Sequence, residues 1–183
     1  MEMIKIKNDE GKVIHTVDAD TLEGANLRGV DLCNAKLTNA DLKGADLRGA
    51  ILEEADLSGS NLRGANLHGA CLHAADLTSA NLTGANLSGA DIEAANLTGA
   101  DLSNTNLSGV SFDSANLTTV NLEGSNMIGI SMQHANLSGA NLRGANLVRS
   151  GLSGADLSDA DLRNADLRGA DIVCIKVNEN TKF

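Results

Sequence analysis

The sequence predicts an all-β solenoid, a stack of coils in which short extended segments alternate with tight turns. An apolar residue recurs at every fifth position from Leu22 to Ile172, and 26 of these 31 central positions are Leu. Ala lies two residues before the centre at 22 of 30 positions, Asp or Asn directly before it at 24 of 30, and Gly two residues after it at 17 of 30. A period of five matches neither a helix nor a long strand. Each unit buries its Leu only against its neighbours, so many units must stack.

Residues 1–19 lie outside the repeat and predict an antiparallel β-hairpin. Two apolar segments, residues 3–7 and 13–17, flank the turn-forming run Asn-Asp-Glu-Gly at residues 8–11. The open end of a solenoid needs cover against edge-to-edge pairing. We therefore expect this hairpin to cap the N-terminal end of the stack.

The repeat itself predicts how each unit is built. Ala and Leu lie two residues apart, so they share one face of a short extended segment, and the following Gly suits a turn with positive φ. Six interior positions between residues 110 and 132 carry side chains larger than their equivalents elsewhere, which predicts a local swelling of the core. These positions are Val110, Phe112, Val120, Met127, Ile130 and Met132.

The unit resembles the motif of the pentapeptide repeat proteins. The segments Ala-Asp-Leu-Arg-Gly at 45–49 and Ala-Asn-Leu-Thr-Gly at 95–99 carry the resemblance, which extends over residues 20–179. It implies a right-handed quadrilateral β-helix with twenty residues per coil, here about eight coils, followed by a short C-terminal tail at 180–183. The sequence supports this coil size independently. Asp or Asn is replaced at six positions, and five of these differ by multiples of twenty: Ile51, Cys71, Ser111, Ser131 and Gly151, with Lys36 the exception.

Four columns of units give the rod four faces, which we name first to fourth after their first central residues, Leu22, Leu27, Leu32 and Leu37. On the fourth face only Ser or Thr follows the centre as far as Ser158, which predicts a hydroxyl ladder that packs along the rod. The third face has no Lys or Arg in any of its units. It carries seven acids: Asp31, Glu53, Glu54, Asp91, Glu93, Asp113 and Asp171.

The third face is the candidate contact surface for a protein partner, because it combines one-sided charge with departure from the repeat consensus. The predicted binding residues are Asp31, Ile51, Glu53, Glu54, Asp91, Glu93 and Asp113. Neutral variation at tolerant surface positions is the alternative interpretation. The turn positions of this face also lack Gly from Asn34 to His134, so we expect its turns to avoid positive φ.

Little in the sequence indicates catalysis or the binding of a cofactor or metal. No nucleophile–base pair or phosphate-binding loop occurs at a meaningful spacing, so we expect no enzymatic activity and no cofactor. One column, Glu53, His73 and Glu93, carries metal-ligand side chains about 5 Å apart on successive coils. A surface charge ladder is the simpler interpretation of this column, and we expect no metal there.

The C-terminal end predicts a second contact. Residues 171–177 form the most apolar stretch, and an uncovered final coil invites pairing with another chain. We expect a two-fold, end-to-end homodimer, and the resemblance points the same way because related proteins often dimerise through this end. The buried residues would be Leu157, Leu162, Ile172, Ile175, Val177 and Phe183. The alternative is a monomer whose tail folds back, with Phe183 covering the end.

Composition narrows the function further. The chain has no Trp or Tyr, no apolar run of membrane-spanning length and no signal-peptide pattern. Three cysteines are too few and too scattered for a disulfide framework or a zinc site. The net charge of −10 opposes direct nucleic-acid binding. We expect a cytoplasmic, non-enzymatic protein-interaction scaffold that does not bind membranes.

The alternative function is mimicry of DNA. Some members of the family, the quinolone-resistance proteins, resemble anionic duplex rods and bind DNA gyrase or topoisomerase IV. Duplex DNA carries one charge per about 1.7 Å, or roughly 22 charges over a rod of about 38 Å. Residues 20–179 hold 20 acids and 10 bases, a net charge of only −10.

Overall fold

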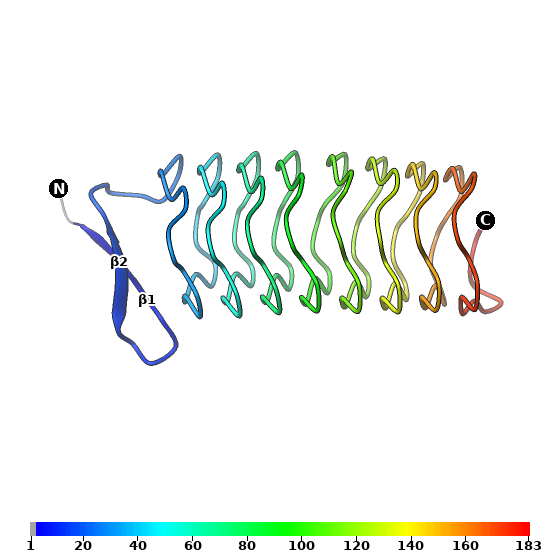
Figure 1. Cartoon of the computed structure of the whole chain (residues 1–183), viewed down its shortest axis with the longest axis horizontal. Helices are drawn as coiled ribbons and strands as arrows, with labels where there is room; N and C mark the ends of the chain where they lie inside the picture. Colours follow the sequence, from blue (N-terminus) through cyan, green and yellow to red (C-terminus); the bar gives the residue numbers. More distant parts are fainter. Residues whose placement is uncertain (1–2) are drawn as a thin grey trace.

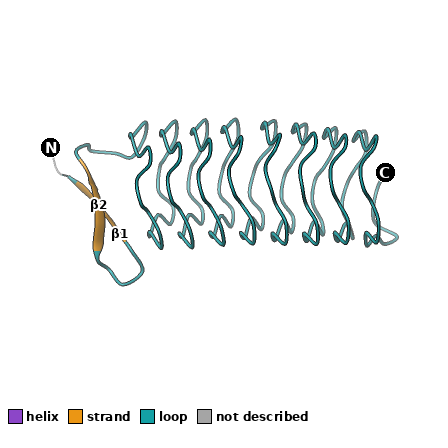
Figure 2. Ribbon diagram, in the orientation of Figure 1, coloured by secondary structure: helices purple, strands orange, loops and turns teal. Residues whose placement is uncertain are grey.

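The computed structural model describes residues 3–183 as a straight rod of stacked coils with a hairpin at its N-terminal end (Figure 1). These residues contain no helix, and therefore none long and apolar enough to cross a membrane. Figure 2 draws the coils as loops, because each extended segment contributes a single bridged residue to its column. The predicted all-β repeat architecture is confirmed.

The predicted hairpin is present. Strand β1 (Ile4–Lys7) pairs antiparallel with β2 (Val13–Val17), with a register irregularity between Ile6 and Lys7. The hairpin is anchored to the first coil, because the Lys36 N–H donates to the Lys7 carbonyl at 2.7 Å. Ile6, only 3% exposed, joins the core of the rod.

The coils pair in a register of twenty residues. Parallel bridges join residues twenty apart, from Asn26 with Asp46 to Asp156 with Lys176. Within one step, the Leu27 N–H donates to the Asp46 carbonyl at 2.8 Å, and the Asp46 N–H donates to the Ala25 carbonyl at 2.9 Å. The coil size inferred from the replaced Asp/Asn positions is therefore the register of the backbone. Leu and Ala columns point inward and form one apolar cluster that runs from the hairpin to Leu162.

The turns on the third face differ from expectation. The residues at its turn positions have φ between 55° and 58°, so the expectation that this face avoids positive φ is wrong. These residues are Asn34, Glu54, Ala74, Ala94, Ser114, His134 and Cys174. Every turn from Leu22 to Leu167 closes in the same way, with the N–H three residues after the centre bonded to the central carbonyl, as in Ala75 to Leu72 at 3.0 Å. Because the ladder fixes where each turn begins and ends, it imposes positive φ whatever side chain is present.

One step of the ladder is incomplete. With coils counted in blocks of twenty from residue 20, the fourth (80–99) and fifth (100–119) lack several backbone bonds that the register predicts. Leu87 donates no bond to Asn106, and Ile92 donates none to Ser111. The fully buried Phe112 lies on the third face directly beside this step, and Figure 1 shows a wider gap between these two coils. The swelling predicted from the large interior side chains coincides with this opening.

The inward and outward columns predict opposite effects for neighbouring substitutions. Leu87 is fully buried, whereas Ser88 is half-buried at the surface. Leu87→Asp places a carboxylate among stacked Leu side chains, so we expect it to lower the free energy of unfolding by several kcal/mol. Ser88→Asp should leave it within about 0.5 kcal/mol. Chemical denaturation followed by circular dichroism measures both, and equal effects would contradict the assignment.

The turn geometry predicts a stabilising glycine. Ala74 has φ 55°, a conformation that costs an L-residue about 1–2 kcal/mol, whereas glycine adopts it freely but loses about 0.5–1 kcal/mol more backbone entropy on folding. Ala74→Gly should therefore stabilise the rod by about 0.5–1 kcal/mol. Gly64→Ala is the matched control: it has φ 65° with open space around the added Cβ, and should destabilise by about 1 kcal/mol. Thermal unfolding that moves both variants in the same direction would refute this account.

Candidate interaction faces and the C-terminal end

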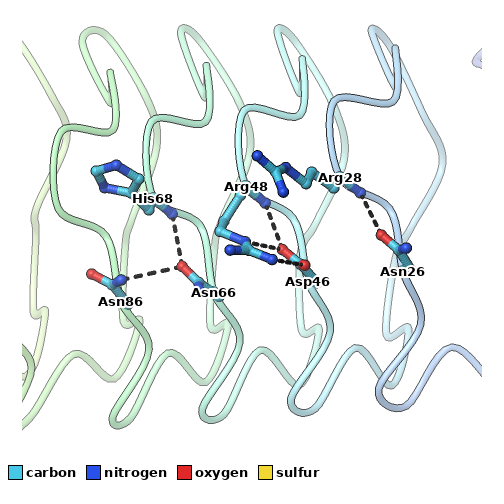
Figure 3. Close-up of polar contacts among 7 residues, drawn as sticks. All are labelled: Asn26, Arg28, Asp46, Arg48, Asn66, His68 and Asn86. Carbon is cyan, nitrogen blue, oxygen red and sulfur yellow. Dashed lines mark hydrogen bonds and ion pairs between the residues drawn. The ribbon is translucent and has the colours of Figure 1, made fainter.

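The Asp/Asn column closes the turns of the rod. In every intact unit except that of Asn126 the side-chain Oδ1 accepts a hydrogen bond from the N–H two residues on, as Asn26 does from Arg28 and Asn66 does from His68 (Figure 3). Asp and Asn are the residues that form such Asx turns. The strong preference at this position is therefore structural, a role that the sequence analysis did not assign.

The Asp and Asn side chains also bond to one another along the rod, from one coil to the next. The Asn86 side-chain amide donates to Asn66 Oδ1 one coil earlier at 3.1 Å (Figure 3). Asn61 donates likewise to Asp41 at 2.9 Å, and Asn121 donates to Asp101 at 3.0 Å. An amide that follows a carboxylate donates a hydrogen bond to it and keeps like charges apart. The alternation of Asp and Asn therefore serves the stability of the rod.

Three arginines on the first and second faces pair with an acid of their own unit. Arg48 binds Asp46, Arg163 binds Asp161 and Arg168 binds Asp166, each within one unit. The hydrogen bonds from the Arg48 guanidinium lower the pKa of Asp46 to about 2 (Figure 3). These pairs are solvent-exposed, so each contributes little to stability. Their effect is to leave these two faces nearly neutral.

The third face carries acids without cationic partners. None of its seven acids forms an ion pair with any described residue. Five of the predicted binding acids are exposed: Asp31, Glu53, Glu54, Asp91 and Glu93. Ile51, at 42% exposure, lies in the same bridged column as Asp31 and Asp91. Asp113 differs, because it is half-buried and accepts a bond from the Gln133 N–H at 2.8 Å. Asp113 is thus the least available residue of the predicted set.

On the fourth face the hydroxyls bond to the Asp/Asn side chains rather than to one another. Thr98 and Thr118 donate instead to the Asp/Asn of their own units, at 2.7 and 2.6 Å. The hydroxyls therefore strengthen the Asx turns. They are held at the surface by these bonds and carry no charge.

The expected metal-ligand column is only partly assembled. The structure brings His73 together with Asp91 and Glu93, and one ligand atom from each lies within 4.8 Å of the others. Glu53, the third member of the column, is not part of this group. Asp91 joins the group instead, and its Oδ1 accepts the Glu93 N–H at 3.1 Å, the Asx turn of its own unit.

The C-terminal end corrects the expected dimer interface. Leu157 is fully buried and Leu162 is 2% exposed, so neither is available to a second chain. The residues that follow cover them. The Leu157 N–H donates to the Lys176 carbonyl at 2.8 Å, and the Leu162 N–H donates to the carbonyl of Lys182, in the tail, at 2.7 Å. The tail therefore folds back, as the alternative expected, but Phe183 remains 68% exposed and does not cover the end. Ile172, at 51%, and Val177, at 48%, are also exposed, whereas Ile175 is half-buried.

A shallow groove on the second face was missed by the sequence analysis. It has a volume of about 410 Å³ and is lined by Ile128, Val148, Arg149, Arg168 and Gly169. Ile128 is 41% exposed. The signal was present in the sequence, because Ile128 and Val148 are apolar in a column otherwise occupied by polar residues. A second cleft, of about 280 Å³, lies between β2 and the first coil beside Asp31 and Cys33.

Comparison with known proteins identifies the same five-residue repeat. The sequence model of the pentapeptide repeats matches in eight copies, with matched segments between residues 21 and 172. No curated protein matches the chain.

Solved structures of pentapeptide repeat proteins are similar to the chain. Rfr23 from the cyanobacterium Cyanothece 51142 is 35% identical over 59% of this chain and 63% of that chain, with a TM-score of 0.39, so the match spans less than two thirds of Rfr23. HetL, involved in heterocyst differentiation regulation in Nostoc sp. strain PCC 7120, is 32% identical over 86% and 90% of the two chains, with a TM-score of 0.29. A trypsin-treated form of QnrB1, a plasmid-mediated fluoroquinolone resistance protein, is 22% identical over 85% and 91%, with a TM-score of 0.47.

Proposed function

Because the chain belongs to the pentapeptide repeat family, we propose that it is a non-enzymatic scaffold that presents its third face to a protein partner. In this proposal the rod is a right-handed quadrilateral β-helix of about eight coils, and the hairpin caps its N-terminal end. The observation that carries the proposal is the third face itself, where exposed acids lie in register with no ion-pair partner among the described residues.

The chemistry of this face suits a basic protein surface. Unpaired acids attract a basic partner and orient it during encounter, which raises the association rate and fixes the register. The exposed Ile51 lies between Asp31 and Cys71 in the column and offers an apolar anchor within the acidic surface. A rigid rod also loses little conformational freedom on binding.

Mimicry of DNA toward DNA gyrase or topoisomerase IV is the alternative function. The net charge of −10 and the rod shape favour it. The spacing of charge does not, because residues 64–142 hold only six acids and the Asn side chains separate stacked carboxylates such as Asp41 and Asp101. We therefore place the scaffold first.

Charge reversal on the third face tests the scaffold. Glu53→Lys, Glu93→Lys and Asp113→Lys together should abolish capture of the partner in pull-downs from the source cell, because they replace attraction by repulsion. The matched control removes three hydroxyls from the fourth face by Thr78→Ala, Thr98→Ala and Thr118→Ala, and should leave capture intact. Loss of capture only in the control would move the site to the fourth face. Inhibition of gyrase supercoiling by the unaltered protein at micromolar concentration would favour the alternative function.

We also propose a homodimer through the C-terminal end. The N–H groups of Leu167, Gly169, Ile172 and Cys174 donate no backbone hydrogen bond, which leaves an open edge beside the exposed Ile172, Val177 and Phe183. Two-fold pairing of such edges satisfies both the backbone groups and the apolar side chains.

Light scattering under reducing conditions measures this association. At tens of micromolar we expect twice the chain mass of 18.8 kDa, and Val177→Asp with Phe183→Ser should return the monomer because a charge in the contact opposes burial. A monomer mass for the unaltered protein would remove the dimer. A dimer that survives both substitutions would place its interface elsewhere.

A further inference from the structure

We propose that His73, Asp91 and Glu93 form a binding site for a divalent transition-metal ion, a property that goes beyond the scaffold function. One ligand atom of each residue lies within 4.8 Å of the other two. Zinc sites commonly combine imidazole nitrogen with carboxylate oxygen at about 2.0–2.2 Å from the ion, with water completing a tetrahedron. A tetrahedron of that size spaces its ligand atoms about 3.4 Å apart. Small side-chain rotations of these surface residues close the remaining difference.

The backbone fixes where the three ligands start. His73 belongs to the third coil, and Asp91 and Glu93 belong to the fourth. On one side of His73 the Leu72 N–H donates to the Asp91 carbonyl at 2.7 Å, and on the other the Ala74 N–H donates to the Glu93 carbonyl at 3.0 Å. The ligand positions are therefore locked by ladder bonds on both sides of the imidazole, as a rigid scaffold for a site requires.

Hydrogen bonds outside the site orient both carboxylates. Glu93 Oε1 accepts from the Ser111 hydroxyl at 3.0 Å, and Asp91 Oδ1 accepts from the Glu93 N–H at 3.1 Å. The second oxygen of each carboxylate accepts no bond from the described residues and is free to bind an ion. Outer partners of this kind typically change metal affinity by about 10- to 100-fold.

The charge around the site favours the binding of a cation. No Lys or Arg occurs in residues 64–142, and neither Asp91 nor Glu93 is in an ion pair. A divalent ion supplies the positive charge that this stretch of the chain lacks. The imidazole sets the type of ion, because nitrogen ligands favour zinc, nickel and copper, whereas calcium and magnesium prefer all-oxygen sites.

Direct titration of zinc into tag-free protein, with isothermal calorimetry in a non-chelating buffer, tests the site. We expect one ion per chain, stronger binding of zinc than of calcium or magnesium, and a higher melting temperature with zinc because the ion binds the folded state. His73→Ala should weaken zinc binding at least as much as loss of an outer partner, about 10- to 100-fold. Asp91→Asn with Glu93→Gln should do the same with little change in shape, because Asn is the commonest residue at the position before the centre when all four faces are counted.

Two matched controls separate this site from other zinc ligands. His134→Ala removes a second exposed histidine from the same face, outside the group, and should leave affinity unchanged. Cys71→Ser removes the thiol paired in register with Asp91 and should also have no effect. Equal affinity in His73→Ala and the unaltered protein would overturn the proposal, as would absence of zinc binding or its loss in Cys71→Ser alone. These outcomes do not involve the partner of the third face, so they leave the scaffold proposal to its own test.

Discussion

The backbone bonds between coils set every other feature of this rod. At nearly every step the central residue donates its N–H to the carbonyl nineteen residues ahead, as Leu27 does to Asp46, and the residue before the centre donates twenty-one residues back, as Asp46 does to Ala25. Each coil must therefore contain the same number of residues, because one extra residue would rotate all later side chains out of their columns. The first extra residue occurs only in the tail, where Asp161 pairs with Lys182 rather than with residue 181.

Once the register is fixed, each outward column has one chemical task. The Asp/Asn column caps turns, and its amides bond to the coil before, as between Asn121 and Asp101. Most of the third-face column has lost this cap: Ile51 and Cys71 have no side-chain oxygen, and Ser111 offers the Asp113 N–H only a long contact of 3.5 Å. These units keep their turns because the ladder and the turn bond remain. The third face thus carries other side chains at a small local cost in capping, which is why its composition is free to vary.

Features with a periodic or local signal could be predicted from the sequence, whereas features that depend on side-chain direction or on the non-repeating tail could not. The hairpin, the twenty-residue register and the swelling around Phe112 follow from local patterns. The third-face turns were mispredicted because the absence of Gly was taken to reflect the backbone, whereas Ala74 and Glu54 simply accept the φ that the ladder imposes. The cover over the last coil was expected only in the alternative monomer, because the tail has no repeat and the Thr181 hydroxyl that bonds the Leu157 carbonyl at 3.0 Å has no periodic signal. Asp91 rather than Glu53 groups with His73 because of the directions of the side chains. The spacing of residues along the sequence does not predict those directions.

The metal-ligand group and the incomplete step of the ladder meet on the third face. Between the third and fourth coils the backbone is fully bonded around His73, but one coil further on Ile92 donates no bond to Ser111. There the Ser111 hydroxyl reaches back to Glu93 at 3.0 Å, and the Ala94 N–H still bonds the Asp113 carbonyl at 3.1 Å. A side-chain bond thus crosses the step where the adjacent backbone bonds are missing, and it ends on one of the three metal-ligand residues. An ion on Glu93 would strengthen the polarisation of that carboxylate and of the Ser111 hydroxyl bonded to it. The metal-ligand residue Glu93 therefore lies beside the most weakly bonded step of the rod, and the buried Phe112 lies on the other side of that step.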